Sequence, residues 1–206
     1  MLDALSQIDV SLLYAANGAH HPLLDAVMLF VTDIKKTGIL LLLVWLGLLW
    51  KGGGKGRTVA LMLLPLILIT DQLSSHVLKD LFGRVRPCEV LDGVRAIDGC
   101  RHSPSFPSSH AVNSFAAATL FALHYRRWVA WLAFGLAALV SYSRIYLGLH
   151  YPSDVLGGAV IGVLCALAVT GVARGVARLA QRTSSSNDQP DARGRGAVCD
   201  SSLRSE

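Results

Sequence analysis

Three short segments of the sequence hold residue types that can bind and transfer a phosphoryl group. They are residues 79–87, 107–110 and 143–154. Phosphate oxygens are bound well by arginine and lysine side chains and by free backbone amides at helix N-termini. With three cations to neutralise the phosphate, we expect no metal ion and no cofactor. Ser108, Ser109 and His110 would begin a helix, so their backbone amides would be free to bind phosphate. The candidate phosphate-binding residues are Lys79, Arg86, Ser108, Ser109 and Arg144.

Two histidines in these segments are candidates for the bond-forming and proton-transferring groups. Phosphoryl transfer through a covalent intermediate needs a nucleophile and an acid for the leaving oxygen. Asp154 follows His150 by four residues, so on a helix the two side chains would share one face. The carboxylate would then hold the imidazole in the tautomer whose other nitrogen can attack phosphorus. We therefore predict His150 as the nucleophile, Asp154 as its partner and His110 as the acid.

Long apolar stretches separate and flank these segments. The chain of 206 residues is 52% hydrophobic, with a mean hydropathy of +0.48. A straight helix needs about 20 residues to cross a bilayer, and most of the stretches approach this length with their flanks. We predict an all-α polytopic membrane bundle of about six helices, with five spans and a short N-terminal apolar helix at 23–31. The apolar stretches are 39–50, 59–78, 111–123, 128–140 and 155–172.

The two ends of the chain differ from the apolar middle. Residues 1–20 show helical apolar spacing without a signal-peptide pattern, and we expect them to lie at the membrane interface. After Gln181 the composition turns to serine, asparagine, aspartate, glycine and arginine. This predicts a membrane-embedded catalytic domain over 1–182 and a disordered cytoplasmic tail over 183–206.

Basic residues cluster in three places, between or after the apolar stretches. If successive spans alternate in direction, the clusters share one face, which the positive-inside rule makes cytoplasmic. The segment 79–107 would then lie on the extracytoplasmic face of a bacterial inner membrane. The clusters also account for much of the net charge of +5, so we expect no nucleic-acid partner. They are Lys51, Lys55 and Arg57, then Arg126 and Arg127, then Arg174, Arg178 and Arg182.

In chain order the three segments read Lys-x6-Arg-Pro, Pro-Ser-x-His and Ser-Arg-x5-His-x3-Asp, from Lys79 to Asp154. This set resembles the signature of the type 2 phosphatidic acid phosphatase superfamily. The resemblance implies a six-helix core, no metal and a phosphohistidine at His150, with His110 as the acid. It assigns phosphate binding to the five residues given above. The family most often has glycine where Ser109 stands, but an amide contact would survive this change. The family also includes soluble vanadium haloperoxidases, but their soluble form disagrees with the apolar stretches of this chain.

Two features lie beside the predicted site. Asp71 stands inside an apolar stretch, where a carboxylate is costly. It would either support the site or be neutral and hydrogen-bonded to a neighbouring helix. Cys88 and Cys100 flank a short loop, and on an extracytoplasmic face a disulfide between them is chemically permitted. Free thiols are the alternative.

The expected substrate is a lipid phosphate whose headgroup lies in the outer leaflet, among membrane lipids. By resemblance to compact bacterial members, we expect undecaprenyl diphosphate, a carrier lipid recycled for cell-wall synthesis. We also expect inhibition by vanadate, which should mimic five-coordinate phosphorus bound to His150. Phosphatidylglycerophosphate, phosphatidate and lipid A phosphates are alternatives. A lipid transporter would need polar groups through the membrane depth, whereas these charges gather at one end. A catalytically dead lipid-binding protein would not need the complete motif set.

Overall fold

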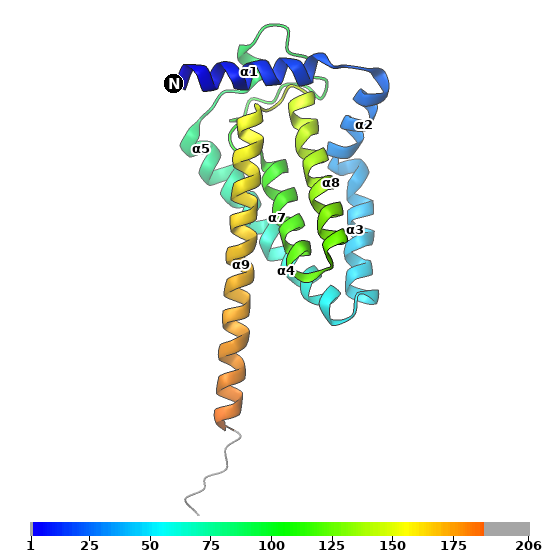
Figure 1. Cartoon of the computed structure of the whole chain (residues 1–206), viewed down its shortest axis with the longest axis vertical. Helices are drawn as coiled ribbons and strands as arrows, with labels where there is room; N and C mark the ends of the chain where they lie inside the picture. The colour runs from blue at the N-terminus through cyan, green and yellow to red at the C-terminus, as the bar shows by residue number, and fades with distance from the viewer. Residues whose placement is uncertain (1, 188–206) are drawn as a thin grey trace, which may run out of the picture. The chain divides into compact units, whose positions relative to one another are not determined.

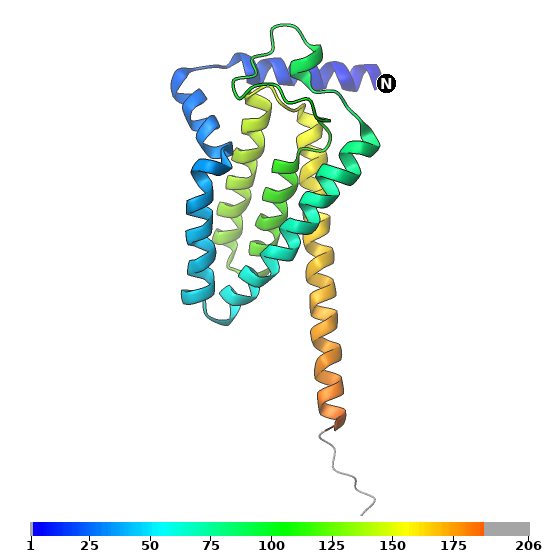
Figure 2. The same ribbon diagram turned by 180° about the vertical axis from the view of Figure 1, so that it is seen from behind.

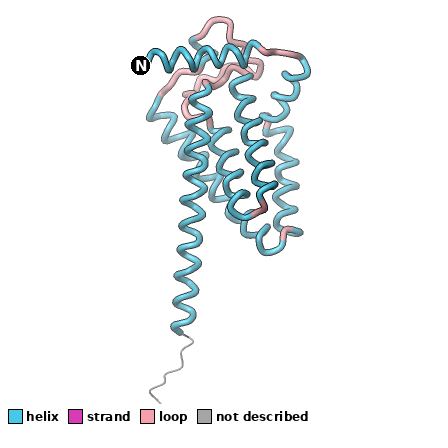
Figure 3. The backbone as a smooth tube through the Cα atoms, in the orientation of Figure 1, coloured by secondary structure: helices cyan, strands magenta, loops and turns pink. Residues whose placement is uncertain are grey.

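The computed structural model describes residues 2–187, and within them every regular element is helical (Figures 1 and 3). This confirms the predicted all-α class. The helices are α1 (Leu2–Gly18), α2 (Pro22–Thr32), α3 (Ile34–Lys51), α4 (Gly53–Gln72), the π-helix η1 (Leu73–Leu78), α5 (Lys79–Phe82), α6 (Pro87–Val90), α7 (Ser109–His124), α8 (Arg127–Tyr146) and α9 (Pro152–Asn187).

Helices α2, α3, α4, α7, α8 and the first part of α9 form a bundle (Figure 2). Helix α7 packs against α4 and α8, α3 packs against α4, and α2 packs against α8. Their common core contains Val59 and Leu66 of α4, Ala116 and Leu120 of α7, and Ala166 of α9, all fully buried. The bundle therefore holds the ends of α7, α8 and α9 beside one another.

Three helical segments are long and apolar enough to cross a membrane by length and composition. They are Gly53–Val90, Arg127–Tyr146 and Pro152–Arg182. Helix α7 has 16 residues and α2 has 11, so both are short for a straight crossing. Helix α3 exposes six consecutive large apolar side chains, from Ile39 to Val44, each at least 50% accessible. Such an apolar outer surface is suited to lipid, and the remaining predicted spans stay predictions.

Two glycines allow α9 to approach α7 closely. A Cβ added to Gly158 would lie 2.8 Å from the Ser108 carbonyl oxygen, and one added to Gly162 would collide with the Val112 carbonyl. Small residues at such spacing let helix backbones come into contact. This contact places the first turn of α7 beside the first turn of α9, where two of the predicted segments lie.

Helix α1 lies across the end of the bundle, beside the loop that joins α6 to α7 (Figures 1 and 2). It buries Asp9, Leu13 and Asn17 and exposes Leu5, Ile8 and Leu12. The helical spacing predicted over residues 1–20 is thus confirmed, with one face of α1 on the protein and an apolar face outward. Its location at a membrane interface stays a prediction.

The C-terminal part of the chain differs in one respect from the sequence expectation. The described residues divide into two units, one up to Thr170 and one from Gly171 onward. Helix α9 continues to Asn187, so the first residues of the tail predicted over 183–206 are helical. The remainder of that tail, 188–206, lies outside the described residues.

Candidate active site

The fold brings the three predicted segments together beneath the loop that joins α6 to α7. Arg86 precedes α6, Arg144 lies in the last turn of α8, and His150 stands in the turn between α8 and α9. All three side chains are at least 97% buried, although each is polar. Buried charges and polar groups are costly unless they are paired, so their clustering indicates a constructed site.

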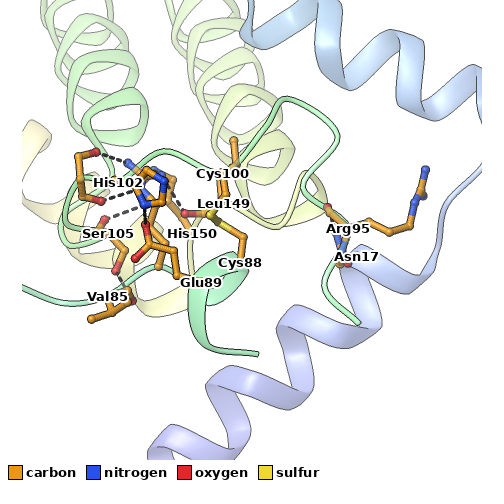
Figure 4. Close-up of a disulfide and its surroundings, with 12 residues drawn as sticks. Asn17, Val85, Cys88, Glu89, Arg95, Cys100, His102, Ser105, Leu149 and His150 are labelled. Atoms are coloured by element: carbon orange, nitrogen blue, oxygen red, sulfur yellow. Dashed lines mark hydrogen bonds and ion pairs between the residues drawn. A yellow bond between two sulfur atoms is a disulfide. The ribbon is translucent and has the colours of Figure 1, made fainter. Parts of the chain in front are cut away.

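The tautomer of His150 follows from its contact with Ser105 (Figure 4). Its Nδ1 lies 2.8 Å from the Ser105 carbonyl oxygen, which can only accept a hydrogen bond. Nδ1 must therefore carry the proton, so Nε2 is the unprotonated nitrogen and holds the lone pair. Nε2 faces Nη1 of Arg86 at 3.3 Å. The nitrogen able to attack phosphorus thus points toward a cation that attracts phosphate.

His150 is neutral at physiological pH. Complete burial lowers its pKa to about 4, and the positive charges of Arg86 and Arg144 act in the same direction. Asp154 opposes them by favouring the protonated ring. The neutral form is the nucleophilic one, so no separate base is needed to activate His150.

The predicted relation between His150 and Asp154 is wrong in its geometry. Helix α9 begins at Pro152, so His150 precedes it and the two residues do not share a helical face. Their closest approach, Nδ1 to Oδ2, is 3.6 Å, which is longer than a good hydrogen bond. The Ser105 carbonyl, at 2.8 Å, has the role that sequence reasoning gave to the carboxylate. Asp154 instead supplies a nearby negative charge and accepts the Tyr151 backbone amide at 2.9 Å.

Arg86 and Arg144 are both anchored by neighbouring groups. Arg86 donates from Nε to the Ser103 carbonyl at 2.7 Å and from Nη1 to the Leu149 carbonyl at 3.0 Å. Arg144 donates from Nη1 to the Thr32 hydroxyl at 2.6 Å. Arg86 also donates from Nη2 to the Ser103 hydroxyl at 3.1 Å, so these contacts fix each guanidinium in place. Lys79, at the start of α5, lies within electrostatic range of both arginines.

Two buried polar atoms of the predicted phosphate-binding residues have no hydrogen-bond partner among the described residues. They are Oγ of Ser108 and Nε of Arg144. An unpaired buried donor is costly, so native proteins seldom retain one without a reason. A phosphate oxygen would satisfy either atom.

The start of α7 corrects one further expectation. Ser108 is the N-cap, and its amide donates to the Asp154 carbonyl at 3.1 Å, so this amide is not free for an anion. The next two amides, of Ser109 and His110, belong to the first helical turn and have no partner within the helix. They are the amides of α7 best placed to bind phosphate.

His110, the predicted acid, lies in the first turn of α7. Its ring lies within electrostatic range of Arg144 and His150, and it faces the backbone carbonyl of Thr32. Thr32 therefore contacts both His110 and Arg144 from the C-terminus of α2. No sequence pattern indicated Thr32, because its contact with His110 is made by its backbone carbonyl, which every residue has.

Asp71 and the two cysteines beside the site all have partners in the structure. Asp71 accepts a long hydrogen bond, 3.5 Å, from Asn113 of α7. A hydrogen bond to a neighbouring helix was part of one of the two alternatives for this residue. Asn113 also accepts from the Thr70 hydroxyl at 2.7 Å, so a polar link joins α4 to α7. Cys88 and Cys100 are joined by a disulfide in the structure (Figure 4). Within residues 2–187, no group of three or more His, Cys, Asp or Glu side chains could hold a metal ion.

Comparison with known proteins assigns the family. A model of the PAP2 superfamily matches residues 60–176, more than half of the chain. The chain belongs to this superfamily. The family named from the three segments is therefore confirmed, and the protein is a membrane-embedded PAP2 phosphatase.

The PAP2 chain is similar to enzymes that act on different lipid phosphates. It is 36% identical over 79% of its length to the lipid A 4′-phosphatase of Bacteroides thetaiotaomicron, 75% of which is covered. It is 30% identical over 87% of its length to phosphatidylglycerophosphatase B of Bacillus subtilis, 90% of which is covered. The crystal structure of Aquifex aeolicus LpxE superposes with a TM-score of 0.68 and 28% identity, covering 79% of this chain and 94% of that one.

Proposed function

We propose that the protein hydrolyses a phosphate from a membrane lipid through a phosphohistidine at His150. The observation that carries the proposal is the geometry of this residue. Its imidazole is buried and neutral, Ser105 holds the proton on Nδ1, and Nε2 faces the Arg86 guanidinium. Such an arrangement suits a nucleophile that attacks an anionic phosphorus centre.

The first chemical step transfers the phosphoryl group to the enzyme. Nε2 of His150 forms a bond to phosphorus as the bond from phosphorus to the lipid oxygen breaks. The electron pair of that bond stays on the leaving oxygen, which takes a proton from His110. Arg86, Arg144 and Lys79 hold the phosphoryl oxygens and balance their negative charge.

The second step releases phosphate. A water molecule gives a proton to His110 while its oxygen bonds to phosphorus. The bond from phosphorus to Nε2 breaks, and its electron pair returns to the imidazole. The enzyme regains a neutral His150, and the proton that His110 took from water replaces the one given to the first leaving oxygen.

Among lipid substrates, we favour a phosphate on a glycolipid of the lipid A type. The support is the identity of 36% with a lipid A 4′-phosphatase over 79% of this chain. The undecaprenyl diphosphate expected from the sequence is the second candidate, since its terminal phosphate offers the same chemistry to His150. Substrate preference is decided outside the phosphate-binding residues, which any of these lipids would use alike.

We further propose that the site opens on the extracytoplasmic side of a bacterial inner membrane. Two basic clusters support this orientation, one at the turn from α3 to α4 and one at the turn from α7 to α8. Both turns lie at the end of the bundle away from α1 and the site (Figure 1). By the positive-inside rule, that end faces the cytoplasm.

Phosphate release by the purified protein in detergent tests the proposal. The substrates are lipid A, undecaprenyl diphosphate, phosphatidylglycerophosphate and phosphatidate, each assayed with a chelator present. We expect release without added metal and inhibition by vanadate, which would mimic five-coordinate phosphorus on His150. The His150→Gln variant is the matched control. Activity that chelator abolishes and magnesium restores would contradict this mechanism.

A further inference from the structure

Arg84, two residues before Arg86, joins two carboxylates at the edge of the site. Its Nη1 lies 2.6 Å from Oδ1 of Asp154, and its Nη2 lies 2.7 Å from Oδ2 of Asp9. The guanidinium also lies over the Tyr151 ring, 3.9 Å from its centroid. Its side chain is 32% exposed, whereas those of Asp9 and Asp154 are 9% and 0% exposed. The two anions are thus the buried members of the group.

Asp9 reaches this group from α1, far away in the sequence. Its Oδ1 accepts the Ser153 backbone amide at 2.8 Å, which satisfies a free donor in the first turn of α9. Its Oδ2 accepts from the Ser153 hydroxyl and from Arg84. The carboxylate therefore binds the very turn that carries Asp154.

The charges of this group do not cancel. Asp9 and Asp154 contribute two negative charges and Arg84 one positive charge, so one net negative charge is left beside a neutral His150. Without Asp9, the guanidinium would pair with Asp154 alone and neutralise it. Burying two carboxylates beside a single cation is costly. If Asp9 served only to attach α1 to α9, an uncharged side chain could do so, and its negative charge would not be needed.

We propose that Asp9 is a positioning residue of the active site, which keeps Asp154 negatively charged toward His150 by sharing Arg84. The inference rests on the proposed function. When Nε2 bonds to phosphorus, the ring retains its Nδ1 proton and becomes positively charged until water breaks the bond. Asp154, with Oδ2 at 3.6 Å from Nδ1, stabilises that charge. Helix α1 thereby becomes part of the catalytic unit.

The test compares variants of the full-length enzyme. Asp9→Asn retains an oxygen to cap α9 but removes the charge. Its kcat should fall about tenfold, the order expected for one unit charge acting across a partly buried site, with KM changed less than about twofold. Asp9→Glu keeps the charge, and its kcat should stay within about threefold of wild type. If the asparagine variant does not fold, Asp9→Ser replaces it.

Asn17→Ala is the matched control, because Asn17 also ties α1 to the bundle. Its side chain donates to the carbonyls of Arg95 and Tyr146, at 2.9 and 2.7 Å, and makes no contact with Arg84. It should lower the unfolding temperature as Asp9→Asn does, yet retain kcat. An unchanged kcat in Asp9→Asn, or an equal loss in Asn17→Ala or Asp9→Glu, would overturn the inference. Absence of phosphate release by the wild-type enzyme would instead overturn the proposed function.

Discussion

At the scale of single residues, the site depends on a backbone carbonyl as much as on side chains. The Ser105 carbonyl holds the proton on Nδ1 of His150, and no pattern of residue types could have revealed it. The histidines and arginines could be predicted because their chemistry is specific to the side chain. Arg84 stood in the first predicted segment but was passed over, because its partners Asp9 and Asp154 lie 75 and 70 residues away.

Replacing each histidine should separate nucleophile from acid. His150→Gln removes the group that bonds to phosphorus, so activity should fall to background on every substrate. A lipid alcohol leaves poorly and needs the acid, which contributes about 100- to 10,000-fold. A nitrophenolate leaves well without a proton. His110→Gln should therefore abolish lipid monophosphate hydrolysis but retain much of the hydrolysis of p-nitrophenyl phosphate.

Turnover rates of both variants on both substrates provide the measurement. Equal losses for His110→Gln on the lipid and on p-nitrophenyl phosphate would show that His110 mainly binds phosphate. Residual turnover by His150→Gln above background would mean that another residue is the nucleophile.

The burial of His150 also predicts how stability depends on pH. Its pKa is about 4 in the folded protein and 6.5 when unperturbed, so between these values the unfolded chain binds more protons. Above pH 6.5 the ring is neutral in both the folded and the unfolded chain, so burying it has no protonation cost. As pH falls from 6.5 toward 4, protonation favours the unfolded chain and the free energy of unfolding decreases. The loss attributable to this residue is roughly 3 kcal/mol. Unfolding temperatures in detergent should decline less steeply with falling pH for His150→Gln than for wild type; parallel curves would contradict the assignment.

At the scale of elements, apolar patterning predicted the helices but not where their polar ends meet. The long apolar stretches correspond to α3, α4, α7, α8 and α9, because burial in lipid or protein core demands a continuous apolar surface. The His150–Asp154 spacing misled because Pro152 favours the first turn of a helix, so α9 starts after His150 rather than before it. The amide of Ser108 was misassigned because its partner, the Asp154 carbonyl, comes from another helix.

The disulfide is the element-scale feature that is easiest to test. Cys88 and Cys100 are 12 residues apart, and closing so short a loop is expected to stabilise it by about 3 kcal/mol. Cys88 follows Arg86 by two residues, so the bond also restrains the backbone beside Arg86. The Cys88→Ser/Cys100→Ser double variant should unfold at a lower temperature and lose part of its activity.

Mass spectrometry of unreduced, alkylated protein checks the bond directly. Cys165 is a free thiol, so the Cys165→Ser variant serves as the control that identifies the alkylation signal of a free cysteine. Alkylation of both Cys88 and Cys100 in protein from an oxidising compartment would show that the bond does not form. A reductant that leaves the unfolding temperature unchanged would show that the bond does not stabilise the fold.

At the scale of the whole molecule, the orientation in the membrane determines which lipids reach the site. The site lies beside α1, while the basic turns from α3 to α4 and from α7 to α8 lie at the other end of the bundle (Figure 2). A reporter fused after Asn187 should therefore be active only as a cytoplasmic-type reporter. A reporter inserted at Gly93, in the loop from α6 to α7, should be active only as an extracytoplasmic one. The disulfide agrees with this orientation, because such bonds persist outside the cytosol. The reverse pattern for both fusions would place the site in the cytoplasm and remove the argument for an outer-leaflet substrate, while leaving the chemistry at His150 intact.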